Sequence, residues 1–182
     1  MKQSVLFARA NGAILLFVGT LTAADPAPSA KDATAPQIVK ATFLVTGLHC
    51  PPCTTTVEKS LKSLKGVKNV KVDWTTKNAK VEYDEKDVVA QQIANRIAST
   101  SHMMGGNMKY GGWFSLKVPD VAAEGNGEKA KTVLTKIKGV SKVAIYPQQK
   151  AVGVEFTSMG NVTSAQLVEA LKEAGLEASV LP

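Results

Sequence analysis

Two cysteines separated by two residues are the side chains in this 182-residue sequence with the clearest capacity for chemistry. Cys50 and Cys53 are the only cysteines of the sequence, and they stand within Gly47-Leu48-His49-Cys50-Pro51-Pro52-Cys53. A disulfide across two intervening residues closes too small a loop to constrain the unfolded chain much, so stabilisation is a weak explanation for the pair. Thiolates can bind a soft metal ion or attack a disulfide, and the local chemistry alone leaves both functions open.

The sequence on either side of the pair predicts how the two thiols are positioned. Residues 38–45 form a strand-like run, and the apolar residues of 53–64 recur at helical spacing. Cys50 is therefore expected in a loop and Cys53 in the first turn of a helix. The two prolines between them suit a helix start, because that turn leaves its N–H groups unpaired. The positive end of the helix dipole favours the thiolate form of Cys53.

The first 24 residues predict an export signal. Lys2 and Arg9 precede the apolar run 13–19, and small residues then lead to a cleavage site before Asp25. The apolar run is shorter than the about 20 residues that a membrane span needs. We therefore expect an exported protein, periplasmic or secreted, without stable membrane insertion after cleavage. Residues 25–37 are rich in proline and alanine and predict a flexible linker.

The chain is basic, with a formal charge of +7. Its basic residues are mostly lysines scattered along predicted helix faces, and they do not form an arginine cluster interleaved with aromatic residues. This distribution is typical of a solvated surface. We therefore expect no nucleic-acid binding.

From residue 38 the pattern predicts a strand, a helix, two strands, a helix and a strand. The expected bounds after the first helix are a strand at 67–73, a strand at 79–83, a helix at 87–100 and a last strand between 103 and 110. Asn78 is expected to tolerate a positive φ in the turn between the second and third strands. Asp87 is expected to cap the second helix.

The same order recurs 73 residues later along the chain. Leu61-Lys-Ser-Leu-Lys-Gly-Val67 matches Leu134-Thr-Lys-Ile-Lys-Gly-Val140, and one inserted residue follows the second hairpin. In the second copy Thr163-Ser-Ala-Gln166 is a capping-box signature, and Gly175 is typical of a helix end. Self-similarity of this length indicates an internal duplication.

With this motif and this duplicated order, the chain resembles the heavy-metal-associated domain family of copper chaperones, copper-transporting P-type ATPases and periplasmic mercuric-ion binding proteins. The cysteine stretch looks like the family's Gly-Met-x-Cys-x-x-Cys loop, with Leu48 in the methionine's place. The resemblance implies an α+β fold of two tandem ferredoxin-like βαββαβ domains, each an antiparallel four-stranded sheet with two helices on one face. It implies a metal-binding domain at 38–110 and a degenerate copy at 113–182.

The element order and the duplication favour metal binding over catalysis, so the protein is not expected to be an enzyme. Two thiolates suit soft ions, above all Cu(I), followed by Hg(II) and Zn(II). Linear two-sulfur coordination satisfies Cu(I) and Hg(II), whereas zinc wants four ligands. The expected function is that of a metallochaperone, which holds the ion on Cys50 and Cys53 and passes it to a protein partner, either a transporter or a cuproprotein.

Three alternatives stay open. The chain can be a thiol–disulfide oxidoreductase that uses Cys50 as its nucleophile, a binder and scavenger of Hg(II), or a structural protein whose partner binding does not need the cysteines. In an oxidising compartment the pair can also rest as a disulfide, and metal loading would then need a reductant or a protective partner.

Histidine and methionine side chains complete the candidate site. The resemblance places His102 near the cysteines, as a third metal ligand or as a hydrogen-bond donor to a thiolate; a surface histidine at a helix end is the alternative. His49 is expected to point to solvent. Met103 and Met104 are expected in the core more than as ligands, although a thioether would suit Cu(I).

The second copy departs from the first where the chemistry lies. Ala122, Ala123 and Asn126 stand at the positions that correspond to His49, Cys50 and Cys53. Because this copy has no thiol, we expect it to bind no soft metal in this way and to serve as a docking or spacing domain.

Overall fold

The computed structural model describes residues 35–182. The predicted signal peptide (1–24) and most of the predicted linker (25–37) lie outside the described residues. The strands are β1 (Ile38–Thr46), β2 (Val67–Asp73), β3 (Asn78–Asp84), β4 (Gly111–Lys117), β5 (Val140–Tyr146), β6 (Ala151–Phe156) and β7 (Ser179–Val180). The helices are α1 (Pro52–Lys62), α2 (Ala90–Ser99), α3 (Asn126–Thr135) and α4 (Ser164–Glu173), with a 3-10 turn at Pro147–Gln149. Within residues 35–182, every helix is too short or too polar to cross a membrane.

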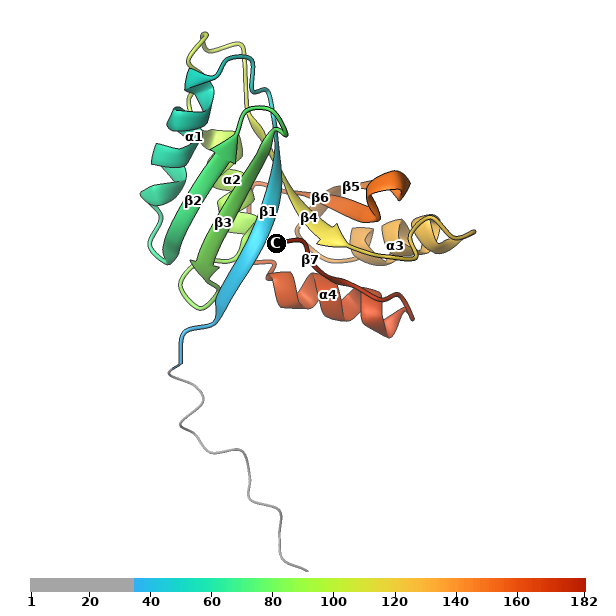
Figure 1. Cartoon of the computed structure of the whole chain (residues 1–182). Coiled ribbons are helices and arrows are strands. Elements are labelled where there is room, and N and C mark those ends of the chain that lie inside the picture. Colours follow the sequence, from blue (N-terminus) through green and yellow to red (C-terminus); the bar gives the residue numbers. More distant parts are fainter. Residues whose placement is uncertain (1–34) are drawn as a thin grey trace, which may run out of the picture. The chain divides into compact units, whose positions relative to one another are not determined.

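The strands form a seven-stranded antiparallel sheet in the order β2-β3-β1-β4-β6-β5, with β7 also beside β4 (Figure 1). The first half has the order β2-β3-β1-β4, and the second half has the order β5-β6-β4-β7. Each is the strand order of a ferredoxin-like βαββαβ unit, so the predicted fold is confirmed. The structure adds that β4 belongs to both units.

Strand β4 is divided between its neighbours along its length. Its first part pairs with β1, where Phe114 lies opposite Phe43, and its second part pairs with β6 and β7, where Leu116 lies opposite Val152 and Val180. The rings of Phe43 and Phe114 meet edge to face, with their centroids 5.3 Å apart. Both rings are fully buried. The two halves therefore share a strand and a continuous core.

The prediction of a strand between residues 103 and 110 is wrong. The structure has only an isolated bridge there, between Ser101 and Lys109, and Gly105 breaks the extended run with a φ of +119°. The first half instead completes its sheet with β4, the first strand of the second copy. Gly112 permits this arrangement, because a Cβ at this position would lie 2.6 Å from the carbonyl oxygen of Ala94 in α2.

The internal repeat extends to the bounds and irregularities of the elements. β5 begins and ends 73 residues after β2, and α4 begins and ends 74 residues after α2, as the inserted residue predicts. The β2–β3 pairing shifts register after Val67, and the β5–β6 pairing shifts register after Val140. A bulge repeated at equivalent positions is a backbone feature that both copies retain.

The turns that follow β2 and β5 share an unusual conformation. The positive φ predicted for Asn78 is found one residue earlier, at Lys77 (57°), and again at the equivalent Lys150 (50°). Each lysine's carbonyl accepts a hydrogen bond of 2.8 Å, Lys77 from the N–H of Val45 and Lys150 from the N–H of Val118. This contact ties each turn to the strand beside it and explains why the lysine keeps its strained backbone.

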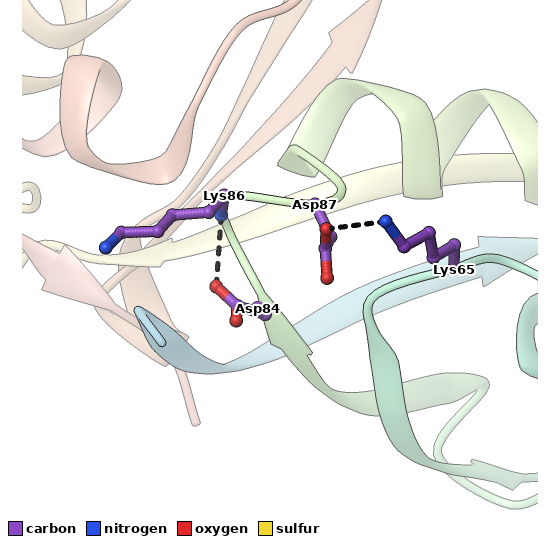
Figure 2. Close-up of polar contacts among 4 residues, drawn as sticks. All are labelled: Lys65, Asp84, Lys86 and Asp87. Atoms are coloured by element: carbon purple, nitrogen blue, oxygen red, sulfur yellow. Dashed lines mark hydrogen bonds and ion pairs between the residues drawn. The ribbon is translucent and has the colours of Figure 1, made fainter. Parts of the chain in front are cut away.

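Asp87 does not cap α2 as predicted. The N–H of Asp87 donates to the carbonyl oxygen of Asp84 at 3.0 Å, and Asp84 Oδ1 accepts from the N–H of Lys86 at 3.1 Å, so these residues form a turn before the helix (Figure 2). The Asp87 carboxylate pairs with the Lys65 ammonium at 3.3 Å. Val89 occupies the cap position instead.

The helix signals of the second copy are confirmed. Thr163 Oγ1 accepts from the N–H of Gln166 at 3.1 Å, and Gln166 Oε1 accepts from the N–H of Thr163 at 3.1 Å, which is the predicted capping box. Gly175 follows α4 with a φ of +76°.

Buried polar groups hold the two halves together. Glu85, between β3 and α2, is 6% exposed, and its carboxylate accepts from the N–H of Ser164 at 2.6 Å and from the Ser164 hydroxyl at 2.9 Å. Ser164 opens α4, so the carboxylate also lies at the positive end of a helix dipole. Burial raises the pKa of the adjacent Tyr83 hydroxyl, and the Glu85 charge raises this pKa further.

A second polar joint involves Gln91 of α2, which is completely buried. Its Nε2 donates to the carbonyl oxygen of Thr157 at 3.0 Å, and its Oε1 accepts from the N–H of Val162 at 3.0 Å. Both partners lie in the loop between β6 and α4. The side chain therefore joins α2 of the first half to a loop of the second.

Candidate metal centre

The two cysteines lie where the sequence predicts, in the loop after β1 and in the first turn of α1. Their Cα atoms are 5.4 Å apart, and a disulfide joins their side chains. Cys53 is completely buried, whereas Cys50 is half-buried. Cys50 is therefore the more exposed residue of the pair.

The start of α1 is free of negative charge. Its first turn contains no acidic residue, and Pro51 stands at the cap position. The N–H of Cys53 donates to the carbonyl oxygen of Cys50 at 3.0 Å. The positive end of the helix dipole is therefore not offset by a carboxylate and can stabilise a thiolate once the disulfide is reduced.

Lys77 is a contributor to this region that sequence reasoning missed. Its ammonium donates to the carbonyl oxygen of Leu48 at 3.1 Å and lies 3.0 Å from the centroid of the Trp74 ring. The turn that carries it is shaped by Asp73, whose Oδ1 accepts from the N–H of Thr76 at 2.9 Å. That hydrogen bond is the main cause that lowers the pKa of Asp73. The repeated lysine is visible in the sequence, but its contact with the cysteine loop depends on the tertiary fold.

His102 packs beside the cysteine loop and is only 9% exposed. Its Nε2 lies 2.9 Å from the carbonyl oxygen of Gly47, and its Nδ1 accepts from the N–H of Met104 at 3.1 Å. Because a backbone N–H can only donate, the ring proton lies on Nε2 and donates to Gly47. The ring packs against that of Tyr110 with centroids 4.5 Å apart and a tilt of 33°, and it lies 5.6 Å from the ring of His49.

These contacts bear on the expected roles of His102. The residue is not a surface histidine, and both of its nitrogens already hold backbone groups of the loops around the cysteines. Within residues 35–182 no three side chains of histidine, cysteine, aspartate or glutamate form a group that could hold a metal ion. Its role as a third ligand stays a prediction, and coordination would first require one of these hydrogen bonds to open.

The equivalent region of the second half carries other side chains. Ala122 and Ala123 lie in the turns before α3, and Asn126 begins that helix. The Asn126 side-chain amide donates to the carbonyl oxygen of Asp120 at 2.9 Å, so it closes its own loop. Gly125, at the cap position of α3, is in the left-handed conformation, whereas Pro51, at the cap position of α1, is in the right-handed helical one. The two loops therefore differ in backbone as well as in chemistry.

The first half of the chain is similar to known proteins. Residues 42–102 match the model of the heavy-metal-associated domain. The chain is 38% identical over 53 residues to the copper-exporting P-type ATPases of Staphylococcus aureus strains JH9 and Newman. This match covers 29% of the chain and only 7% of each ATPase.

Two solved structures are also similar to the chain. Oxidised MerP from Ralstonia metallidurans is 26% identical, with 42% of this chain and 96% of that one covered and a TM-score of 0.36. The N-terminal soluble domains of Bacillus subtilis CopA are 21% identical, with 81% and 96% covered and a TM-score of 0.39. Since both scores are below 0.5, the likeness to this family rests on the sequence match. Residues 42–102, which match the heavy-metal-associated domain model, contain the Cys50–Cys53 pair, and this match covers less than half of the chain.

Proposed function

We propose that the protein is an exported soft-metal carrier, which holds one Cu(I) ion between Cys50 and Cys53 after their disulfide is reduced and passes it to a protein partner. The observation that carries this proposal is the convergence of the two cysteine side chains on one point, since they are close enough to be bonded to each other. Two sulfurs that can meet can also enclose one ion after small side-chain rotations.

The donor set favours Cu(I) as the cargo. Two thiolates satisfy an ion that accepts linear coordination, and the described part of the chain offers no ready group of three or more ligands of the kind zinc prefers. The similarity to copper-exporting ATPases supports copper, and Hg(II) is the second candidate because it accepts the same linear pair.

The unequal burial of the two sulfurs suggests how the ion would move. A thiolate of the partner would reach the ion on the side of Cys50, because Cys53 is sealed in the core. The ion would stay bound to Cys53 while Cys50 exchanges. We propose a transporter or a cuproprotein as partner, with the second half as the docking or spacing domain and with no catalysis.

A Cu(I) titration tests this function. The protein is reduced, freed of reductant without oxygen and titrated with Cu(I) against a competing chelator, together with the Cys50→Ser/Cys53→Ser variant. A single tightly bound equivalent in the wild type that is lost in the variant supports the proposal. Equal weak binding by both proteins contradicts it.

The disulfide itself supports a second candidate, a thiol–disulfide oxidoreductase that uses Cys50 as its nucleophile. The half-buried Cys50 and the sealed Cys53 would suit an attacking and a resolving thiol. This function predicts insulin reduction that disappears in Cys50→Ser. A wild type without this activity that binds Cu(I) would leave the carrier as the function.

A further inference from the structure

Three of the five methionines of the sequence lie within residues 103–108, and all three are exposed. The exposed fractions are 56% for Met103, 58% for Met104 and 39% for Met108. The expectation that Met103 and Met104 are core residues is therefore wrong. Exposed large apolar side chains gathered in one loop require an explanation, because isolated ones are common but clusters are not.

The loop that carries these methionines, residues 101–109, is folded back on itself. Ser101 and Lys109 close it with an antiparallel bridge. Inside it the N–H of Gly105 donates to the carbonyl oxygen of His102 at 3.4 Å, and the N–H of Met108 donates to that of Gly105 at 3.2 Å. Two successive tight turns thus hold the three methionines in one compact segment.

This methionine loop adjoins the cysteine loop. The His102 ring is hydrogen-bonded at one nitrogen to Gly47 and at the other to the N–H of Met104. The same ring lies 5.6 Å from that of His49, the residue before Cys50. A single imidazole therefore connects the backbone of the methionine loop to the backbone that leads into the cysteine pair.

The composition of the loop favours a soft cation over a hard one. The sequence Ser-His-Met-Met-Gly-Gly-Asn-Met-Lys contains no carboxylate, which is the ligand that Mg²⁺ and Ca²⁺ require. Thioether sulfur is a neutral, soft donor and selects Cu(I). Thioethers also do not form disulfides, so their ability to donate does not depend on the oxidation state of Cys50 and Cys53.

We propose that Met103, Met104 and Met108 form a thioether site for a soft monovalent cation of the Cu(I) class, and that this site binds while Cys50 and Cys53 are joined in the disulfide. The site extends the proposed function, because it lies beside the cysteine pair, but it does not require that pair to bind metal. It gives the protein a capacity for the ion in the oxidised state that the structure shows.

Ag(I) is the probe that tests this site, since it is a soft monovalent ion and needs no reductant to keep it in that state. The full chain carrying Cys50→Ser/Cys53→Ser is titrated with Ag(I) by calorimetry, and the methionine methyl resonances are followed by NMR. We expect a single bound equivalent with shifts at three methyl groups. Adding Met103→Leu/Met104→Leu/Met108→Leu removes the equivalent, and leucine keeps the side-chain volume.

Met159 supplies the matched control. It is 84% exposed and lies between β6 and α4 in the second half. Met159→Leu should leave the Ag(I) equivalent unchanged. Absence of binding in the thiol-free parent, as expected if the methionines only dock a protein, overturns the proposal, and so does binding that survives in the triple variant.

Cu(I) titration of the reduced triple variant separates the two sites. For this titration the three methionine substitutions are made in the chain that keeps Cys50 and Cys53. This variant should retain the cysteine-bound equivalent, so a failure of the thioether site is distinguishable from a failure of the carrier function.

Discussion

The two halves of the molecule share the same backbone fold, but only the first half carries cysteines. Three features recur 73 residues apart: the bounds of β2 and β5, the bulge at the start of each of these strands, and the lysine with a left-handed backbone in the turn that follows. Cys50 and Cys53 nevertheless correspond to Ala123 and Asn126. The fold therefore does not depend on the cysteines, and the metal chemistry that we propose would belong to one loop on a backbone that folds without it.

The halves also differ after their second helices. The first half has the nine-residue methionine loop there and then borrows β4 from its neighbour, whereas the second half turns at Gly175 and enters its own short β7. Borrowing β4 leaves residues 101–109 outside the sheet. Residues 101–109 therefore form a loop beside the cysteines. If the first half had its own last strand, these residues would form that strand.

Transplanting the cysteines should break the chemical difference between the halves. Ala123→Cys/Asn126→Cys places thiols at the equivalent positions, and we expect the reduced variant to bind a second thiolate-bound Cu(I) equivalent, in addition to any ion at the methionine loop. Its affinity should be lower than that of the first site, because Gly125 leads into α3 with a different backbone from Pro51. Stoichiometry is measured by anaerobic Cu(I) titration.

The control for the transplant removes the native pair. Cys50→Ser/Cys53→Ser in the same background should reduce the thiolate-bound stoichiometry from two equivalents to one. If the transplanted protein still binds only a single thiolate-bound equivalent, the loop backbone and not the missing thiols sets the difference between the halves.

Breaking the joint between the halves should have the next largest effect. Glu85→Ala leaves the N–H and hydroxyl of Ser164 without their buried acceptor, and we expect a loss of about 3 kcal/mol in the free energy of unfolding. Urea denaturation measures it. The exposed Glu177→Ala should change stability by less than about 0.5 kcal/mol. Equal values for both would show that Glu85 does not join the halves.

Close packing of α2 on the shared strand β4 predicts that alanine at Gly112 destabilises the fold more than alanine at Gly153, with a smaller effect than Glu85→Ala. Gly112→Ala drives a Cβ toward the backbone oxygen of Ala94 at 2.6 Å, and backbone cannot move aside, so we expect a loss of about 2 kcal/mol. Gly153→Ala meets the Tyr146 side chain at 3.1 Å, which can shift, so its cost should be lower. Thermal unfolding of both variants measures the difference, and the reverse order would argue against close packing of α2 on β4.

Local patterns predicted most of the frame. The β2 bounds, the capping box at Thr163 and the helical position of Cys53 all follow from neighbouring residues, and the structure has each of them. The sharing of β4 could not be predicted in this way, because strand pairing joins residues far apart in sequence and either of two runs could have closed the first sheet. The exposure of Met103 depends on that same choice.

The smallest difference between the two copies lies at Lys77. Its left-handed backbone recurs at Lys150, but the hydrogen bond of its ammonium to the cysteine loop does not. Lys77→Met removes the hydrogen bond to Leu48 and a positive charge bonded to the cysteine loop, whereas Lys150→Met removes a lysine with the same left-handed backbone in the second half. We expect Lys77→Met to weaken Cu(I) binding by about 0.5–1.5 kcal/mol, a factor of about 2–13, and Lys150→Met to leave it unchanged. Both affinities are read by chelator competition. Because the backbone cost is matched, a loss confined to Lys77→Met belongs to its side chain, whereas equal losses would assign the effect to the turn and remove Lys77 from the site.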